Sequence, residues 1–304
     1  MKVAYGYPLM SAPPAPELVD GVTLGTIAAA VESAGFTALG LTDHPAPPDN
    51  WRRSGGHDAV DPFVGLAMVA AATTHLRLLT YLVVLPYRNP FLLAKSIASL
   101  DALSRGRVEL GVGTGYQRGE FRALGVDFEE RNTLFDEALR TLVAAWTGEP
   151  VTEKGEHFLA EGIASLPTPA QQPHPPIWLG GNGALTRRRV IDYGAGWLPL
   201  PNARASAHVL RSPALETLDD LAELLTDLRR RAEDAGKPAP DRVMYFLANA
   251  TDDEGFRTHR ETIARLPELG VDWVYVNGHG RTEKEALTWI ERYQEAVLSR
   301  IPAA

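Results

Sequence analysis

Two glycine-rich strand ends decide the fold of this chain: Leu110-Gly111-Val112-Gly113-Thr114-Gly115-Tyr116 and Ile177-Trp178-Leu179-Gly180-Gly181-Asn182-Gly183. Each begins as an apolar run, as a buried strand does, and each ends in backbone that carries almost no side chains. Glycine permits a sharp turn, and it lets a flat ring or a phosphate approach main-chain N–H groups with no Cβ in the way. The pair therefore predicts one elongated cofactor that lies across the ends of several strands.

Short β-rich runs and longer helical patterns alternate along the rest of the chain. The expected strands are Val3–Tyr7, Ala38–Thr42, Leu76–Val83, Arg107–Val112, Ile177–Gly180, Ala195–Leu198, Val243–Ala248 and Trp273–Val276. The expected helices are Val22–Ser33, Pro62–Thr73, Pro90–Leu103, Arg131–Trp146, Ala184–Asp192, Leu215–Ala235, Glu254–Leu266 and Thr282–Leu298. Strict alternation is typical of a parallel sheet, and eight such units in 304 residues favour a closed (β/α)8 TIM barrel. We predict an α/β fold with one barrel domain over residues 1–304.

Loop lengths indicate which end of the barrel carries the chemistry. Helix-to-strand connections are mostly short and marked by glycine, whereas the strand-to-helix loops Asp43–Asp61 and Pro199–Pro213 are long. Long loops without structure of their own are usually functional in compact domains, and barrel active sites lie at the carboxyl ends of the strands. The stretch Thr147–Pro176 lies on the opposite side, where it predicts a small hairpin before the fifth strand.

Composition limits the partners that this protein can have. Its net charge of −8 argues against an electrostatic grip on nucleic acid or on an anionic membrane. The chain has no cysteine, which excludes disulfides, thiolate nucleophiles and cysteine-ligated metals. No apolar stretch approaches the length of a membrane span. We expect a cytoplasmic protein that acts on a small molecule.

Several other chemistries that barrels and nucleotide sites support are poorly matched. The first strand ends Tyr5-Gly6-Tyr7, which lacks the His-x-His pair of a metal-dependent amidohydrolase, and we expect no metal. The fourth and seventh strands end without the carboxylates of a retaining glycosidase. The G-x-G-x-G run lacks the third glycine of a Rossmann fingerprint, because Tyr116 and Arg118 stand nearby instead. After these classes are set aside, the sequence favours an enzyme that depends on a cofactor.

The second strand ends Leu41-Thr42-Asp43-His44-Pro45, which supplies the candidate catalytic residues. Neighbouring strand residues point to opposite faces, so Asp43 and His44 are not expected to form an acid–base pair merely because they are adjacent. One of them should face the barrel mouth, where a histidine could exchange a proton near neutral pH. Trp51 and His57 follow on the long loop, which we interpret as a lid over the substrate.

The residues between Leu100 and Phe158 resemble bacterial luciferase-like flavin and deazaflavin oxidoreductases. The resemblance is carried by Leu103-Ser104-Arg105-Gly106-Arg107, Gly111-Val112-Gly113-Thr114-Gly115-Tyr116, Glu120-Phe121, Gly125-Val126-Asp127-Phe128, Arg131, Glu137 and Trp146-Thr147-Gly148. Pro176-Ile177-Trp178-Leu179-Gly180-Gly181 is similar to a second signature of that family. The combination of Thr42-Asp43-His44-Pro45, Leu85-Pro86-Tyr87-Arg88-Asn89-Pro90 and Gly115-Tyr116 looks most like the branch that uses coenzyme F420.

The resemblance implies roles for named residues. Asp43 and His44 would lie near the reactive deazaflavin ring, and Gly113, Thr114, Gly115 and Tyr116 would line it. A bulge in the third strand, with a non-prolyl cis peptide near Tyr81-Leu82, would back the ring. Gly180, Gly181, Asn182 and Gly183 would hold the cofactor phosphate at the start of the fifth helix, where free N–H groups favour an anion. Many relatives have a hydroxyl residue where Asn182-Gly183 stands.

Three functional hypotheses follow from the resemblance. The first is an F420-dependent oxidoreductase that transfers hydride between the deazaflavin and a small organic substrate, with His44 as proton donor or acceptor and Trp51 at the substrate. The second is an FMN-dependent monooxygenase that uses dioxygen and a partner reductase. The third is a flavin- or F420-binding protein without turnover. Family likeness also implies a homodimer.

Overall fold

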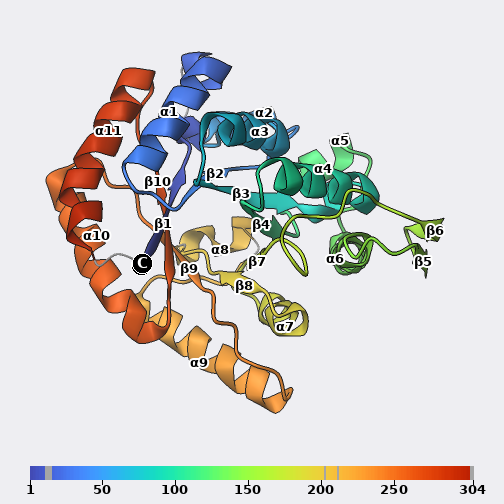
Figure 1. Cartoon of the computed structure of the whole chain (residues 1–304). Helices are drawn as coiled ribbons and strands as arrows, with labels where there is room; N and C mark the ends of the chain where they lie inside the picture. The colour runs from blue at the N-terminus through green and yellow to red at the C-terminus, as the bar shows by residue number, and fades with distance from the viewer. Residues whose placement is uncertain (11–15, 202, 211, 302–304) are drawn as a thin grey trace.

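The computed structural model describes residues 1–10, 16–201, 203–210 and 212–301, and eight parallel strands within these ranges form one sheet (Figure 1). The strands are β1 Lys2–Gly6, β2 Ala38–Leu41, β3 Arg77–Val84, β4 Val108–Gly113, β7 Ile177–Gly180, β8 Gly196–Leu198, β9 Met244–Leu247 and β10 Trp273–Asn277. Their order is β8-β7-β4-β3-β2-β1-β10-β9. A bridge between Trp197 and Val243 links the two edge strands, so the sheet forms a nearly closed barrel. The predicted barrel fold is confirmed.

Longer helices connect the strands and cover the outside of the barrel (Figure 1). They are α1 Gly21–Ser33, α3 Pro62–Ala72, α4 Pro90–Leu103, α6 Arg131–Ala145, α7 Ala184–Tyr193, α9 Leu218–Asp234, α10 Asp253–Arg265 and α11 Glu283–Ala296. Local chemistry sets where they begin. The Asp61 carboxylate accepts from the amides of Phe63 and Val64, and Pro62 occupies the first turn, where its missing N–H costs nothing.

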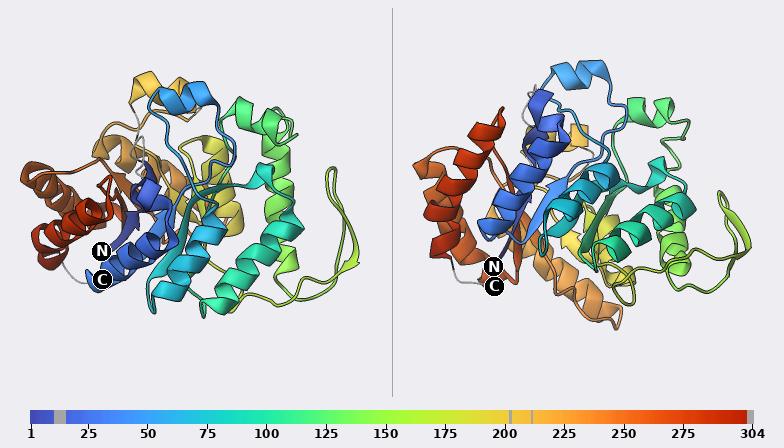
Figure 2. Two further views of the ribbon diagram at one scale, coloured as in Figure 1. Left: turned by 90° about the horizontal axis from the view of Figure 1, so that it is seen from above. Right: turned by 45° about the horizontal axis from the view of Figure 1, so that its top comes forward.

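Three short helices were not predicted from the sequence. They are α2 Asp49–Arg53, α5 Arg118–Ala123 and α8 Arg204–Leu210, and α2 and α8 lie inside the two loops that we expected to lack structure. Helices of five to seven residues are too short to show a periodic apolar pattern. All three follow carboxyl ends of barrel strands and lie at the same end of the barrel (Figure 2).

A hairpin interrupts the alternation before the fifth barrel strand, as predicted. It consists of the antiparallel strands β5 Val151–Lys154 and β6 Leu159–Ile163, and it stands away from the barrel (Figures 1 and 2). The His157 ring anchors its turn to α6 through contacts with the carboxylates of Glu137 and Glu130. The hairpin is remote from the strand ends that form the candidate site.

The third strand contains an irregularity that shapes the barrel mouth. Its pairing with β4 shifts between Thr80 and Val83, and the peptide bond between Tyr81 and Leu82 is cis. Both features agree with the expectation from the family resemblance. The barrel interior below them is filled by large side chains, among them Trp178 and Tyr275. In the described ranges, no helix is both long and apolar enough to cross a bilayer.

Candidate active site

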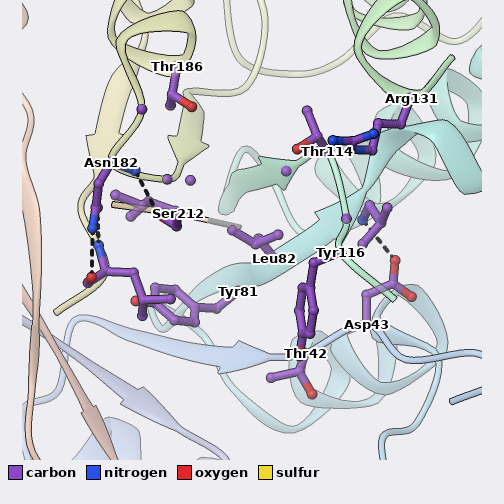
Figure 3. Close-up of a pocket in the computed structure, with 18 of the residues that line it drawn as sticks. Thr42, Asp43, Tyr81, Leu82, Thr114, Tyr116, Arg131, Asn182, Thr186 and Ser212 are labelled. Atoms are coloured by element: carbon purple, nitrogen blue, oxygen red, sulfur yellow. Dashed lines mark hydrogen bonds between the residues drawn. The ribbon is translucent and has the colours of Figure 1, made fainter. Parts of the chain in front are cut away.

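A cavity of about 500 Å³ opens at the carboxyl ends of the strands, between β2, β3, β4, β7 and β8 (Figure 3). The structure brings nearly all of the predicted site residues to its wall. They are Asp43, His44, Tyr81, Leu82, Gly113, Thr114, Gly115, Tyr116, Gly180, Gly181, Asn182 and Gly183. Trp51, the predicted substrate residue, is not part of the wall.

His44 is held by a carboxylate that sequence reasoning did not identify. Its Nδ1 lies 3.0 Å from Oε2 of Glu120, which α5 supplies and which is fully buried. Glu120 also accepts from the amide of Ala46 and the hydroxyl of Tyr87. A carboxylate can accept from an imidazole N–H, so this contact suits a proton on Nδ1 of His44, and Nε2 is the ring nitrogen not engaged by Glu120.

The carboxylate of Asp43 binds Arg88 rather than His44. Its two carboxylate oxygens accept from both terminal nitrogens of Arg88, at 2.5 and 2.8 Å, and one of them also accepts from the amide of Val84. Arg88 reaches on to Asp61 at the start of α3. This geometry makes Asp43 an anchor for the strand end, while its predicted catalytic role stays a prediction.

The expected lid packs on His44 through its aromatic rings. The Trp51 ring lies 4.6 Å from the His44 ring and 5.4 Å from the His57 ring, measured between centroids. His57 itself lines the cavity and contacts the carbonyl of Asp58 through Nδ1. Burial lowers the pKa of His57, so the neutral ring is favoured. Trp51 therefore covers the outer side of His44.

The glycines of the two strand ends make room for Leu82. A Cβ added at Gly113 would lie 2.5 Å from a methyl of Leu82, and one added at Gly180 would also meet this side chain. Leu82 thus lies between the ends of β4 and β7, on the floor of the cavity. Gly115 and Gly181 have φ angles of +75° and +123°, which side chains rarely adopt.

The start of α7 offers backbone donors to the cavity. Gly183 precedes the first turn, no side chain caps that turn, and a Cβ at Gly183 would meet no atom within 4 Å. The first amides of a helix have no acceptor within it. The Asn182 side chain bonds the backbone of Leu200 and Pro213, and the predicted place of Asn182 in the phosphate cradle stays a prediction.

Two arginines complete this side of the cavity. Arg131, the first residue of α6, was noted only as part of the family signature, yet it lines the cavity beside Thr114 (Figure 3). Its guanidinium packs on the Phe128 ring, 4.0 Å from the centroid, and donates to the Phe128 carbonyl. Arg189 also lines the cavity, but Asp136 holds its guanidinium through two hydrogen bonds.

No cluster of three or more histidine, aspartate or glutamate side chains suited to a metal occurs in the part of the chain that the structure describes. The polar groups of the cavity include His44, which is backed by a carboxylate, the first backbone amides of α7 and the guanidinium groups of Arg131 and Arg189. This set can exchange a proton at one side and bind an anion at the other.

Proteins with similar sequences include an uncharacterised protein and two proteins named as F420-dependent dehydrogenases. An uncharacterised protein of Mycobacterium tuberculosis is 29% identical over 290 residues, which cover 90% of this chain and 93% of that protein. The F420-dependent hydroxymycolic acid dehydrogenase of the same organism is 32% identical over 174 residues, 56% of this chain and 47% of the enzyme. The F420-dependent glucose-6-phosphate dehydrogenase of Gordonia bronchialis is 31% identical over 187 residues, 60% of this chain and 54% of the enzyme.

Solved structures share the fold. The monooxygenase RslO1 from Streptomyces bottropensis superposes with a TM-score of 0.77 at 19% identity, over 98% of this chain and 99% of that chain. An F420-dependent secondary alcohol dehydrogenase superposes with a TM-score of 0.70 at 17% identity, over 99% of both chains. The family model for luciferase-like monooxygenases matches residues 14–296. The chain therefore belongs to the luciferase-like monooxygenase family.

Proposed function

We propose that this protein is an F420-dependent oxidoreductase. The observation that carries the proposal is the division of one cavity into two sides, with His44 and Glu120 at one and the starts of α6 and α7 at the other. When bound, the deazaflavin accepts or supplies a hydride at C5. The protein then has to hold an elongated anionic molecule and move one proton beside it.

The choice of F420 over FMN rests on two kinds of support. Two curated relatives at about 30% identity are named as F420-dependent dehydrogenases. The strand-end residues Thr42-Asp43-His44-Pro45 also look most like that branch. The FMN-dependent monooxygenase is the second candidate, because the fold is shared with a Baeyer–Villiger monooxygenase in complex with FMN. That structure superposes with a TM-score of 0.65 at 18% identity, over 88% of this chain and 71% of that chain.

The residues present fit such a cofactor. The open space at Gly183 and the uncapped start of α7 suit a phosphate, and Arg131 supplies a positive charge nearby. Leu82 and the glycine-lined end of β4 present a flat, side-chain-poor surface to a ring. These are the places where an elongated flavin analogue finds donors at one end and apolar backing at the other.

His44 exchanges the substrate proton in this proposal. Glu120 fixes the ring and stabilises the imidazolium that forms when Nε2 takes a proton. Trp51 and His57 shield the ring from bulk water, which protects a hydride in transit. Asp43 positions the end of β2 through Arg88 and does not itself exchange the proton.

The first prediction concerns cofactor choice. Equilibrium titration by calorimetry should give an F420 dissociation constant at least roughly tenfold lower than that of FMN. Mass spectrometry of small molecules released from the purified protein gives an independent reading. Tighter binding of FMN would favour the monooxygenase, and F420 binding without turnover of any alcohol or carbonyl compound would favour a carrier.

The second prediction tests the phosphate end. Gly183→Ala adds one methyl group where no protein atom lies within 4 Å and where φ is −70°, so folding should be unaffected. The methyl would crowd a phosphate at the start of α7, and we expect F420 affinity to fall about tenfold or more. Gly25→Ala is the matched control, because it adds a methyl in ordinary contact within α1. Unchanged affinity in folded Gly183→Ala would place the phosphate elsewhere.

The third prediction separates chemistry from binding at His44. His44→Gln keeps a polar side chain but removes the imidazole proposed to exchange the substrate proton, so turnover should fall roughly 100-fold or more while F420 affinity changes little. His279→Gln, at an exposed loop position, serves as the control. Turnover of His44→Gln near the wild-type rate would mean that the proton travels through water or through His57.

The fourth prediction assigns Asp43 to positioning. Asp43→Asn leaves the largely buried Arg88 guanidinium without its bidentate partner, and we expect unfolding by urea to show a loss of about 3 kcal/mol. Asp49→Asn removes the exposed pairs with Arg52 and Arg53 and should cost less than about 1 kcal/mol. Equal losses in the two variants would argue against this anchoring role.

A further inference from the structure

Charged side chains are unevenly distributed over the cavity wall. Among its wall residues that the structure describes, both arginines, Arg131 and Arg189, come from α6 and α7, and the one carboxylate, Asp43, lies beside His44. Figure 3 shows Arg131 and Thr186 along one side of the cavity and Asp43 and Thr42 along the opposite side. The start of α7 lacks a side-chain cap, which adds one positive helix end to the arginine side, whereas α6 begins after the acidic residue Glu130.

Among the residues that the structure describes, the arginines near His44, namely Arg88 and Arg52, are paired with carboxylates, as Arg189 is on the opposite side. Both terminal nitrogens of Arg88 are committed to Asp43, and His44 itself lies on the carboxylate of Glu120. Arg52, on the lid, pairs with Asp49 and with Asp58. A negatively charged group that entered this side would lose its hydration without gaining a free counter-charge, and such transfers are costly.

The cavity wall also includes apolar and aromatic side chains, besides the polar Thr42, His57 and Tyr116 near His44. Phe246 and Tyr81 line the cavity, and both stack with Tyr275 below them, at 5.7 and 3.7 Å between ring centroids. Leu198, at the end of β8, and Leu200, which follows β8 beside Asn182, add further apolar surface. The cavity into which His44 opens therefore includes surface that suits hydrocarbon, with polar groups near His44 able to reach an oxygen atom.

We propose that the His44 side selects an electrically neutral substrate, namely an alcohol or the corresponding carbonyl compound with apolar flanks, and rejects phosphate esters and carboxylates. This inference rests on the proposed function. In the oxidising direction the carbinol C–H bond breaks, its hydride passes to oxidised F420, and the O–H proton passes to Nε2 of His44 as the C=O bond forms. Reduction is the reverse. The selection would separate this chain from the relative named for glucose 6-phosphate.

Matched substrate pairs test the selection. The alcohols 2-pentanol and 4-hydroxypentanoate share the same carbinol carbon and differ in a terminal methyl group or carboxylate, and glucose and glucose 6-phosphate form a second pair. With the F420-loaded enzyme, we expect kcat/KM for at least one neutral member to exceed that of its charged partner tenfold or more. Calorimetric binding of 2-pentanone and 4-oxopentanoate to the loaded enzyme should show the same order without relying on turnover.

A charged side chain introduced into the cavity wall tests whether the charge of the wall causes the preference for neutral substrates. Thr42→Lys places a cation on the Asp43 side, and it should raise the ratio of charged to neutral kcat/KM at least tenfold within the pentanol pair. Thr42→Met adds similar length without charge and should keep the wild-type order. The binding assay with the two ketones provides the same comparison for each variant.

The outcomes separate this inference from the proposed function. Equal or better use of the charged members, or an unchanged ratio in folded Thr42→Lys, would overturn the neutral selection while F420-dependent hydride transfer stands. Failure of every neutral compound to react or bind would also overturn it, even where titration shows that F420 binds. Failure of F420 itself to bind would instead overturn the proposed function.

Discussion

The candidate site depends on one buried carboxylate. Glu120 is fully buried, so its polar carboxyl oxygens need hydrogen-bond partners around them. Those donors come from His44 and Ala46 after β2 and from Tyr87 after β3, while Glu120 itself follows β4. One side chain thus ties together the ends of three neighbouring strands. The position of His44, the packing of the lid on it and the shape of that side of the cavity all follow from this contact.

The opposite side is built from backbone. There the useful groups are amides and empty space, because Gly183 and Gly181 carry no side chains and the start of α7 has no cap. A carboxylate or hydroxyl in these places would satisfy the amides and fill the room that an anion needs. Asn182 avoids this by turning its side chain toward Leu200 and Pro213, which also fixes the loop after β8 against the loop after β7.

The alternation of short apolar runs with longer helical patterns predicted the barrel, because neighbouring residues alone display both. The same reasoning missed α2, α5 and α8, which are too short to show a period, and it missed the partners of His44 and Asp43. Glu120 lies 76 positions from His44, and Arg88 lies 45 positions from Asp43. Only the closed barrel brings such residues together, so a single sequence showed which strand ends matter without showing which side chains meet there.

The two glycine runs that predicted the fold have different physical tasks in the proposed function. At β4, Gly113 makes room for Leu82, and the resulting surface is apolar and suits a ring. At β7, the run ends in a helix start that suits a phosphate, and Arg131 lines the same cavity. In the proposed function, a cofactor with a neutral ring and an anionic tail suits both runs best with its tail at the start of α7, because a reversed tail would lie beside the Asp43 carboxylate. The proposed orientation then leaves the His44 end of the cavity to the substrate.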